Sequence, residues 1–152
     1  MPTIILFQPQ IPQNTGNIVR SCHVTGTKLI LVEPLGFSIN DRWLKRAGLD
    51  YWEGVDLEVI GNLEERLLAT SSNFYFFSSH ATKRFTDINY QSDDLLIFGS
   101  ETSGLPANFL AQWPERFVTI PMKPGARCLN LATSAGIAIY ELQRQLGYIF
   151  EG

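Results

Sequence analysis

The sequence has few cysteines and histidines and no long apolar run. Its 152 residues include only two cysteines, Cys22 and Cys128, and two histidines, His23 and His80. The cysteines lack the spacing of a metal site, so we predict buried, reduced thiols and no bound metal. No apolar run approaches the roughly 20 residues of a membrane helix. Because the first residues also lack a signal-like segment, we expect a cytoplasmic protein without a membrane partner.

Several familiar catalytic motifs are missing as well. The chain has no G-x-G-x-x-G dinucleotide turn, no P-loop lysine motif and no G-x-S-x-G nucleophile elbow. Two histidines argue against a histidine-based triad or a histidine-rich metal site. The known classes of enzyme that depend on these motifs are therefore excluded as first hypotheses.

A general excess of positive charge is also absent. Lysine and arginine total 12 against 15 acidic residues, for a net charge of −3. This balance argues against indiscriminate binding of nucleic acid through a basic face. Three local clusters remain, each of which can equally be an ordinary solvated face. They are Arg42, Lys45 and Arg46; Lys83 and Arg84; and Lys123 and Arg127.

What the sequence does contain is an alternation of strand-like and helical patterns. Predicted strands cover residues 3–8, 28–33, 55–60, 74–77, 95–98 and 117–120, and predicted helices cover residues 14–25, 41–47, 63–69 and 130–146. The apolar runs are continuous, which is typical of strands covered on both faces. Helices between strands imply right-handed crossovers and a mostly parallel sheet. We predict one α/β domain over residues 1–152, with residues 79–92 as a polar loop over the carboxyl edge of the sheet; the alternative is an ordinary exposed loop.

Three polar segments follow or adjoin these strands, and ligands of open α/β sheets bind beyond the carboxyl ends of strands. The first, residues 14–20, opens a helix whose free N–H groups favour an anion such as phosphate. Asn14 and Arg20 lie less than two turns apart, so both can reach one cleft. The alternative is that Asn14 only caps the helix.

The other two segments are residues 99–106 and residues 120–130. In the first, Glu101 is the only charge and lies between glycines, which let the backbone approach a ligand closely. In the second, Ile120, Met122 and Leu129 are suited to form apolar walls. Glu101 as a surface charge and Leu129 as ordinary core are the alternatives.

In their order along the chain, these segments resemble the three motifs of the SPOUT RNA methyltransferases. The similarity is greatest to the small, single-domain tRNA (cytidine/uridine-34)-2'-O-methyltransferases, and it extends over the whole chain. The motifs are Asn14-x-Gly16-Asn17-x-x-Arg20, then Phe98-Gly99-x-Glu101-x-x-Gly104-Leu105-Pro106, then Ile120-Pro121-Met122 with Arg127-x-Leu129-Asn130-Leu131.

The resemblance implies a C-terminal deep trefoil knot, S-adenosylmethionine as cofactor and a homodimer whose active site uses both chains. The substrate it implies is the wobble ribose in a tRNA anticodon loop. The cofactor-binding residues that it implies are Phe77, Gly99, Gly104, Ile120, Met122, Cys128 and Leu129. The residues implied at the methyl-transfer centre are Asn14, Arg20, Glu101 and Asn130. A dimer would gather Arg42, Lys45, Arg46, Lys83 and Arg84 into an RNA-binding surface.

Two departures from the family pattern and several alternatives stay open. Family members often have serine at the positions of Cys128 and Ala132, and a thiol is the weaker hydrogen-bond donor. Arg20 is either the base or a group that binds phosphate and stabilises charge, since arginine stays protonated in proteins. Other hypotheses are methylation of another RNA position, a non-catalytic RNA-binding module and an enzyme acting on a small nucleotide-like substrate.

Overall fold

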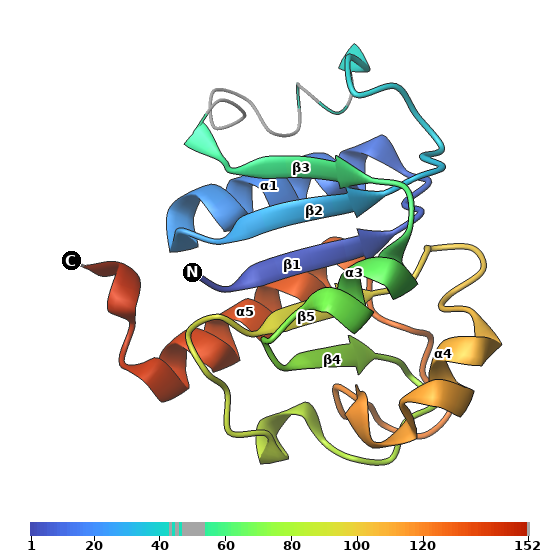
Figure 1. The fold of residues 1–152 in the computed structure, drawn as a ribbon, viewed down its shortest axis with the longest axis vertical. Coiled ribbons are helices and arrows are strands. Elements are labelled where there is room, and N and C mark those ends of the chain that lie inside the picture. Colours follow the sequence, from blue (N-terminus) through green and yellow to red (C-terminus); the bar gives the residue numbers. More distant parts are fainter. Residues whose placement is uncertain (43, 45, 47–53, 152) are drawn as a thin grey trace.

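A six-stranded, all-parallel β-sheet forms the centre of the molecule (Figure 1). The computed structural model describes residues 1–42, 44, 46 and 54–151. The strands are β1 (Thr3–Phe7), β2 (Lys28–Val32), β3 (Leu57–Ile60), β4 (Phe74–Phe77), β5 (Leu95–Phe98) and β6 (Phe117–Val118). They lie in the order β3-β2-β1-β5-β4-β6, and every pair of neighbours is parallel. All carboxyl ends therefore meet at one edge of the sheet.

Helices cover both faces of this sheet, which confirms the predicted α/β class. On one face lie α1 (Pro12–Thr25) and α5 (Leu131–Leu146), which pack against each other. On the other lie α3 (Leu63–Ala69) and α4 (Ala107–Gln112). Three single turns of 3₁₀ helix complete the described elements: η2 (Phe85–Asp87), η3 (Pro114–Arg116) and η4 (Ile149–Glu151).

Alternate side chains of each strand enter two separate cores. Ile4 and Leu6 pack with α1 and α5, whereas Ile5 packs with α3 and α4. Ile5 pairs with Ile30 on one side and Ile97 on the other, so this layer continues across the sheet. Because both faces are buried, the strand sequences are continuously apolar rather than alternating.

Most predicted elements are confirmed within about two residues at each end, the usual uncertainty of element ends. Helix α1 begins at Pro12 rather than at residue 14, and proline suits the first position of a helix because its missing N–H needs no partner there. The short helix α4 was not predicted. Of the helix predicted at residues 41–47, residues 43, 45 and 47 lie outside the described residues; residues 42, 44 and 46 are helical, and Asp41 Oδ1 accepts a hydrogen bond from Leu44 N.

The alternative of an ordinary exposed loop at residues 79–92 is wrong for its second half. Phe85, Ile88 and Tyr90 are buried in the core shared by α1 and α5. The Tyr90 hydroxyl donates to Phe85 O over 2.7 Å, and Gln145 Oε1 of α5 accepts from Tyr90 N. Three apolar side chains, spaced irregularly among polar ones, thus anchor this connection.

The two cysteines have different surroundings. Cys22 is buried, as predicted, and burial raises the pKa of its thiol to about 12. Cys128 is exposed, so the prediction of a buried thiol is wrong there, because it lies on the exposed connection before α5. No described helix is long and apolar enough to cross a membrane. Strand order alone does not test the trefoil knot, which stays a prediction.

Candidate active site

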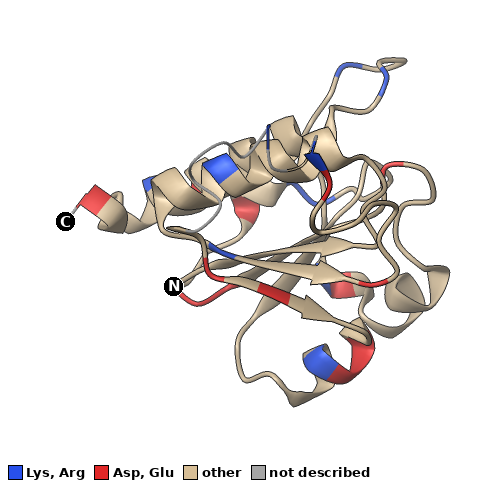
Figure 2. Cartoon of the chain, turned by 90° about the horizontal axis from the view of Figure 1, so that it is seen from above, with Lys and Arg blue, Asp and Glu red and all other residues tan. Residues whose placement is uncertain are grey.

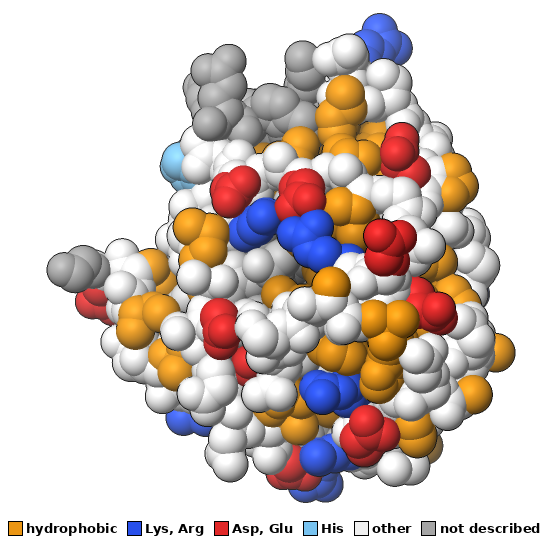
Figure 3. Space-filling view, viewed as in Figure 1, with side chains coloured by type: hydrophobic (Ala, Val, Ile, Leu, Met, Phe, Trp, Pro, Cys, Tyr) orange, Lys and Arg blue, Asp and Glu red, His pale blue; other side chains and the backbone are white. Residues whose placement is uncertain are grey.

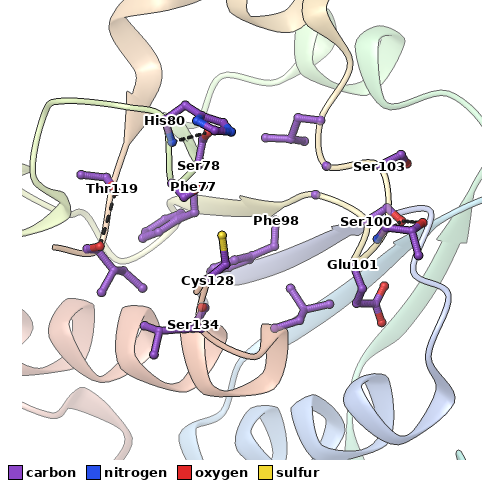
Figure 4. Close-up of a pocket in the computed structure, with 18 of the residues that line it drawn as sticks. Phe77, Ser78, His80, Phe98, Ser100, Glu101, Ser103, Thr119, Cys128 and Ser134 are labelled. Carbon is purple, nitrogen blue, oxygen red and sulfur yellow. Dashed lines mark hydrogen bonds between the residues drawn. The ribbon is translucent and has the colours of Figure 1, made fainter. Parts of the chain in front are cut away.

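A cavity of about 730 Å³ opens at the carboxyl ends of β4 and β5 (Figure 4). Its size is within the range of ordinary small-molecule sites. Among the residues that line it are all seven predicted cofactor-binding residues and three of the four predicted at the methyl-transfer centre. These are Phe77, Gly99, Gly104, Ile120, Met122, Cys128 and Leu129, with Asn14, Glu101 and Asn130.

Glu101 closes one end of the cavity and binds the segment that leads into α1. Its Oε1 accepts from Gln10 N and its Oε2 from Ile11 N, each over 2.9 Å. Oε2 also accepts from Asn14 Nδ2 over 3.2 Å. The anion at this helix start is therefore a carboxylate of the chain itself, where the sequence had suggested phosphate.

Asn14 links Glu101 to the start of α5. It lies inside α1 and is buried, so the alternative that it caps this helix is wrong; Ile11 holds the cap position. Asn14 Oδ1 accepts from Asn130 Nδ2 over 2.9 Å. Asn130 Oδ1 in turn accepts from Ala132 N and Thr133 N, which caps α5. Three residues predicted at the reaction centre thus form one continuous hydrogen-bonded chain.

A tight turn after β5 shapes the wall beside Glu101. Ser100 and Gly104 exchange two backbone hydrogen bonds, of 3.1 and 3.0 Å. Gly104 has φ of +66°, which glycine adopts without strain. At Gly99 a Cβ would come within 2.5 Å of Gly104 C, so only glycine fits there. The close approach that glycine permits here is between parts of the turn itself, and the predicted approach of this backbone to a ligand stays a prediction.

The remaining walls are largely apolar. Phe77 and Phe98 stack at 4.7 Å between ring centroids, and Cys128 lines the same cavity (Figure 4). Met122 and Leu129 are partly exposed although both are large and apolar. An apolar pocket with one polar, anionic end has the character of a site for a nucleoside-like molecule with a positive group.

Arg20 does not line this cavity in its own chain. It lies on α1 with its side chain exposed, whereas Asn14 is buried, so the two residues do not reach one cleft within one chain. Lysines and arginines are distributed over several elements and interspersed with acidic residues (Figures 2 and 3). Of the predicted RNA-binding residues, Arg42, Arg46, Lys83 and Arg84 are exposed, and Lys45 lies outside the described residues. Their role in RNA binding stays a prediction.

Sequence reasoning missed several polar residues of the cavity. Ser78, Ser79 and His80 follow β4 directly, and Ser134 lies one turn after Asn130 on α5. The signal for Ser78 and Ser79 was present, because polar residues directly after a buried strand point to a site at the sheet edge. In the described part of the chain, no three His, Cys, Asp or Glu residues gather as metal ligands.

This combination of parallel sheet and glycine-lined cavity is that of a ligand-binding α/β protein. Residues 1–140 match the SpoU rRNA Methylase family, and the chain belongs to that family.

Comparison with individual proteins gives similar results. The chain is 46% identical over 144 residues to the tRNA (cytidine(34)-2'-O)-methyltransferase of Methylovorus glucosotrophus, covering 93% of this chain and 94% of the relative. A solved structure described as giving insights into the 2-OH methylation of C/U34 on tRNA is 40% identical, with a TM-score of 0.91 and 97% coverage of both chains. The AdoMet-bound rRNA methyltransferase of Sinorhizobium meliloti is 24% identical, with a TM-score of 0.86; the match covers 95% of this chain and 56% of that one. That last similarity concerns the fold alone.

Proposed function

We propose that this protein is a tRNA 2'-O-methyltransferase that uses S-adenosylmethionine and acts on the ribose of cytidine or uridine 34. The observation that carries the proposal is the cavity at the sheet edge, around which ten of the predicted site residues gather. Names of close relatives, such as that of Methylovorus glucosotrophus, support the tRNA substrate and the position. The cytoplasmic location stays a prediction.

The described residues suit the proposed cofactor. An adenosine needs a flat apolar slot and backbone groups at its base edge, and the Phe77–Phe98 pair, Ile120 and the turn at Gly99 offer these. Glu101 supplies negative charge at the other end of the cavity, where a sulfonium would be favoured. When bound, S-adenosylmethionine supplies an activated methyl group, and the protein supplies position and electrostatics.

The hydrogen-bonded chain holds that end of the cavity in one arrangement. Glu101 is fixed by three donors, and Asn14 and Asn130 are fixed by each other. Such preorganisation matters because aligning the acceptor hydroxyl with the methyl donor supplies roughly 7–11 kcal/mol of a barrier. We propose that these residues position the reacting groups and that Arg20 contacts the substrate ribose or its phosphate.

The exposed position of Arg20 leads us to propose the homodimer with shared active sites. A second copy packed on α1 and α5 would bring its own Arg20 toward the cavity mouth. Exposed apolar side chains on these two helices support this choice of surface. They are Val24 of α1 (50% exposed) and Ile137 and Tyr140 of α5 (37% and 45% exposed). Large apolar side chains on two packed helices are typical of a face that a partner covers.

The anticodon loop suits this site because its bases are unstacked and its 2'-hydroxyls are accessible. The test is methyl transfer from labelled S-adenosylmethionine to tRNA and, separately, to rRNA, each from cells lacking the protein. Label in tRNA alone supports the proposal. Label in rRNA alone would contradict it, and RNA binding without label in either would favour the non-catalytic module. Transfer to free nucleosides would favour the small-substrate enzyme.

A further inference from the structure

A second groove, of about 390 Å³, lies beside the cofactor cavity. The two share Ser79, Thr119, Ile120 and Met122 as lining residues, so molecules bound in them would be in direct contact or nearly so. None of the residues predicted at the methyl-transfer centre lines this groove. It is therefore a separate site, which adjoins the cavity at the end opposite Glu101.

The chemistry of the groove is that of an anion site. Among the described residues that line it, Arg84 and Lys123 are the charged ones, and both are positive. The described part of the chain contains no carboxylate within ion-pair distance of either. Hydroxyl groups of Ser79 and Thr82 also line the groove and can donate, whereas the Thr119 hydroxyl donates to Ile120 O over 3.4 Å.

The backbone directs Arg84 into this groove. Thr119 N donates to Lys83 O over 2.8 Å and Phe85 N donates to Thr119 O over 2.9 Å, so Arg84 and Thr119 form a parallel bridge. Phe85 is buried in the core. Because successive side chains of an extended segment point in opposite directions, Arg84 points away from the core. Lys83 is exposed and lines neither cavity.

A turn also holds Lys123 at this groove. Ala126 N donates to Lys123 O over 3.3 Å, and Gly125 has φ of +80°. Glycine adopts this conformation without strain, so the turn is encoded locally. The two cations thus come from segments about forty residues apart and line one groove.

We infer that this groove binds a backbone phosphate of the bound RNA, through Arg84 and Lys123. The inference rests on the proposed function. In RNA the carbon next to the one bearing the 2'-hydroxyl carries the 3'-phosphate. The groove, however, adjoins the cofactor cavity near Thr119 and Ile120, at the end opposite Glu101, so the phosphate that it would hold belongs to RNA that lies away from the methylated ribose. Phosphate contacts of this kind position RNA without reading its sequence.

The experiment compares Arg84→Gln and Lys123→Gln with two controls. Lys28→Gln makes the same change in net charge at the amino end of β2, and Lys83→Gln makes it beside Arg84 but outside the groove. For each variant, tRNA affinity is measured across a range of salt concentrations, and S-adenosylmethionine affinity by titration calorimetry. Thermal unfolding confirms that each variant is folded.

We expect each groove variant to weaken tRNA binding and to lower the slope of log affinity against log salt by about 0.7–1. Lys28→Gln should keep the wild-type slope, Lys83→Gln should lose less than Arg84→Gln, and cofactor affinity should not change. Equal losses for Lys83 and Arg84 would overturn the inference in favour of a diffuse basic surface. Loss of cofactor affinity with unchanged tRNA binding would also overturn the inference, because it would indicate that the groove binds the carboxylate of the cofactor instead of an RNA phosphate.

Failure of the proposed function is distinguishable from failure of this inference. Wild-type transfer of methyl groups to tRNA, measured in parallel, tests the function alone. If the wild type methylates tRNA and the groove variants keep its salt slope, the groove assignment is wrong and the proposed function stands.

Discussion

Asn130 Nδ2 donates a 2.9 Å hydrogen bond to Asn14 Oδ1, although the two residues are 116 positions apart in the chain. This bond joins the first turn of α1 to the cap of α5. It also has a single direction, because Asn14 Nδ2 is needed by Glu101 and Asn130 Oδ1 is needed by the N–H groups of α5. Neither amide can be inverted without opposing two acceptors or two donors.

Replacing the donor of this bond while keeping the helix cap separates its role in catalysis from its role in folding. Asn130→Asp keeps an oxygen for Ala132 N but places a carboxylate against Asn14 Oδ1. We expect methyl transfer to fall about tenfold or more, which is roughly 1.4 kcal/mol. The free energy of unfolding should stay near that of the wild type because the cap remains.

Asn130→Ala is the matched variant, because it loses both the bond and the cap. We expect it to lower the free energy of unfolding by about 0.5–2 kcal/mol, measured by urea denaturation. Full activity of Asn130→Asp would contradict a role for the bond in positioning the site.

Gly99→Ala tests the close approach of the turn to β5. A Cβ at this position would come within 2.5 Å of Gly104 C, so the turn must shift. We expect a loss of about 1–3 kcal/mol in the free energy of unfolding. Affinity for S-adenosylmethionine, measured by titration calorimetry, should fall about tenfold or more.

Gly136→Ala is its control. Gly136 lies inside α5, and a Cβ there meets nothing within 4 Å. Since alanine favours the helix over glycine by roughly 0.5–1 kcal/mol, this variant should be equally stable or more stable. If Gly99→Ala and Gly136→Ala lowered the free energy of unfolding and the cofactor affinity by similar amounts, the crowding at Gly99 would not be the cause of these losses.

Arg20→Ala tests the proposed contact with the substrate. Because Arg20 does not line the cavity of its own chain, the variant should lose methyl transfer and retain cofactor affinity. Titration calorimetry with S-adenosylmethionine and a transfer assay measure the two quantities. Loss of cofactor binding would refute this role for Arg20.

Mixed dimers then show which chain supplies Arg20. If Arg20 acts in the partner's cavity, a mixed dimer of one Arg20→Ala protomer and one Gly99→Ala protomer has one working site. In that site the Arg20→Ala protomer supplies the intact cavity and the Gly99→Ala protomer supplies the intact Arg20. If Arg20 acts in its own chain, both sites stay defective and the mixture stays inactive.

Asp94 gives the stability of the protein a dependence on pH. The residue is fully buried, and burial raises the pKa of its carboxyl to about 6; a hydrogen bond from Gln91 N opposes this shift, and the charge of Asp93 adds to it. Among the described residues, its Oδ1 has no hydrogen-bond partner. The native state therefore holds the proton more tightly than the unfolded chain. Its contribution to stability is complete below the unfolded pKa and is lost as pH rises through about 6.

Asp94→Asn removes this penalty and keeps an oxygen for Gln91 N. At about pH 8 we expect the variant to exceed the wild type in free energy of unfolding by about 1–3 kcal/mol, and near pH 4 the difference should vanish. The exposed carboxyl of Asp56 provides the control, and Asp56→Asn should stay within about 0.5 kcal/mol at either pH. A constant difference for Asp94→Asn across pH would contradict titration of Asp94.

The sheet could be predicted from the sequence because its signal is local. Strands buried on both faces must be continuously apolar, as residues 95–98 are, and helices between them imply parallel pairing. Helix α4 has only six residues and no side-chain cap, so neither periodicity nor an end signal marks it. The buried side chains of Phe85, Ile88 and Tyr90 show no regular spacing, which is why their packing was missed.

The composition of the site was predicted through its motifs, but its bonding was not. That Glu101 binds Gln10 N and Ile11 N depends on contacts between segments about ninety residues apart, and no local pattern specifies such a pair. The exposure of Arg20 likewise follows from how α1 packs. The contrast between Arg84 and Lys83 depends on a single bridge to Thr119.

The central claim is that the protein methylates the ribose of nucleotide 34. The most direct measurement is to incubate the purified protein with S-adenosylmethionine and tRNA from cells lacking it, and to map 2'-O-methylated nucleotides by mass spectrometry of RNA fragments. We predict one new methyl group, on the ribose of cytidine or uridine 34. Methylation at another ribose only, or on a base, would contradict the claim.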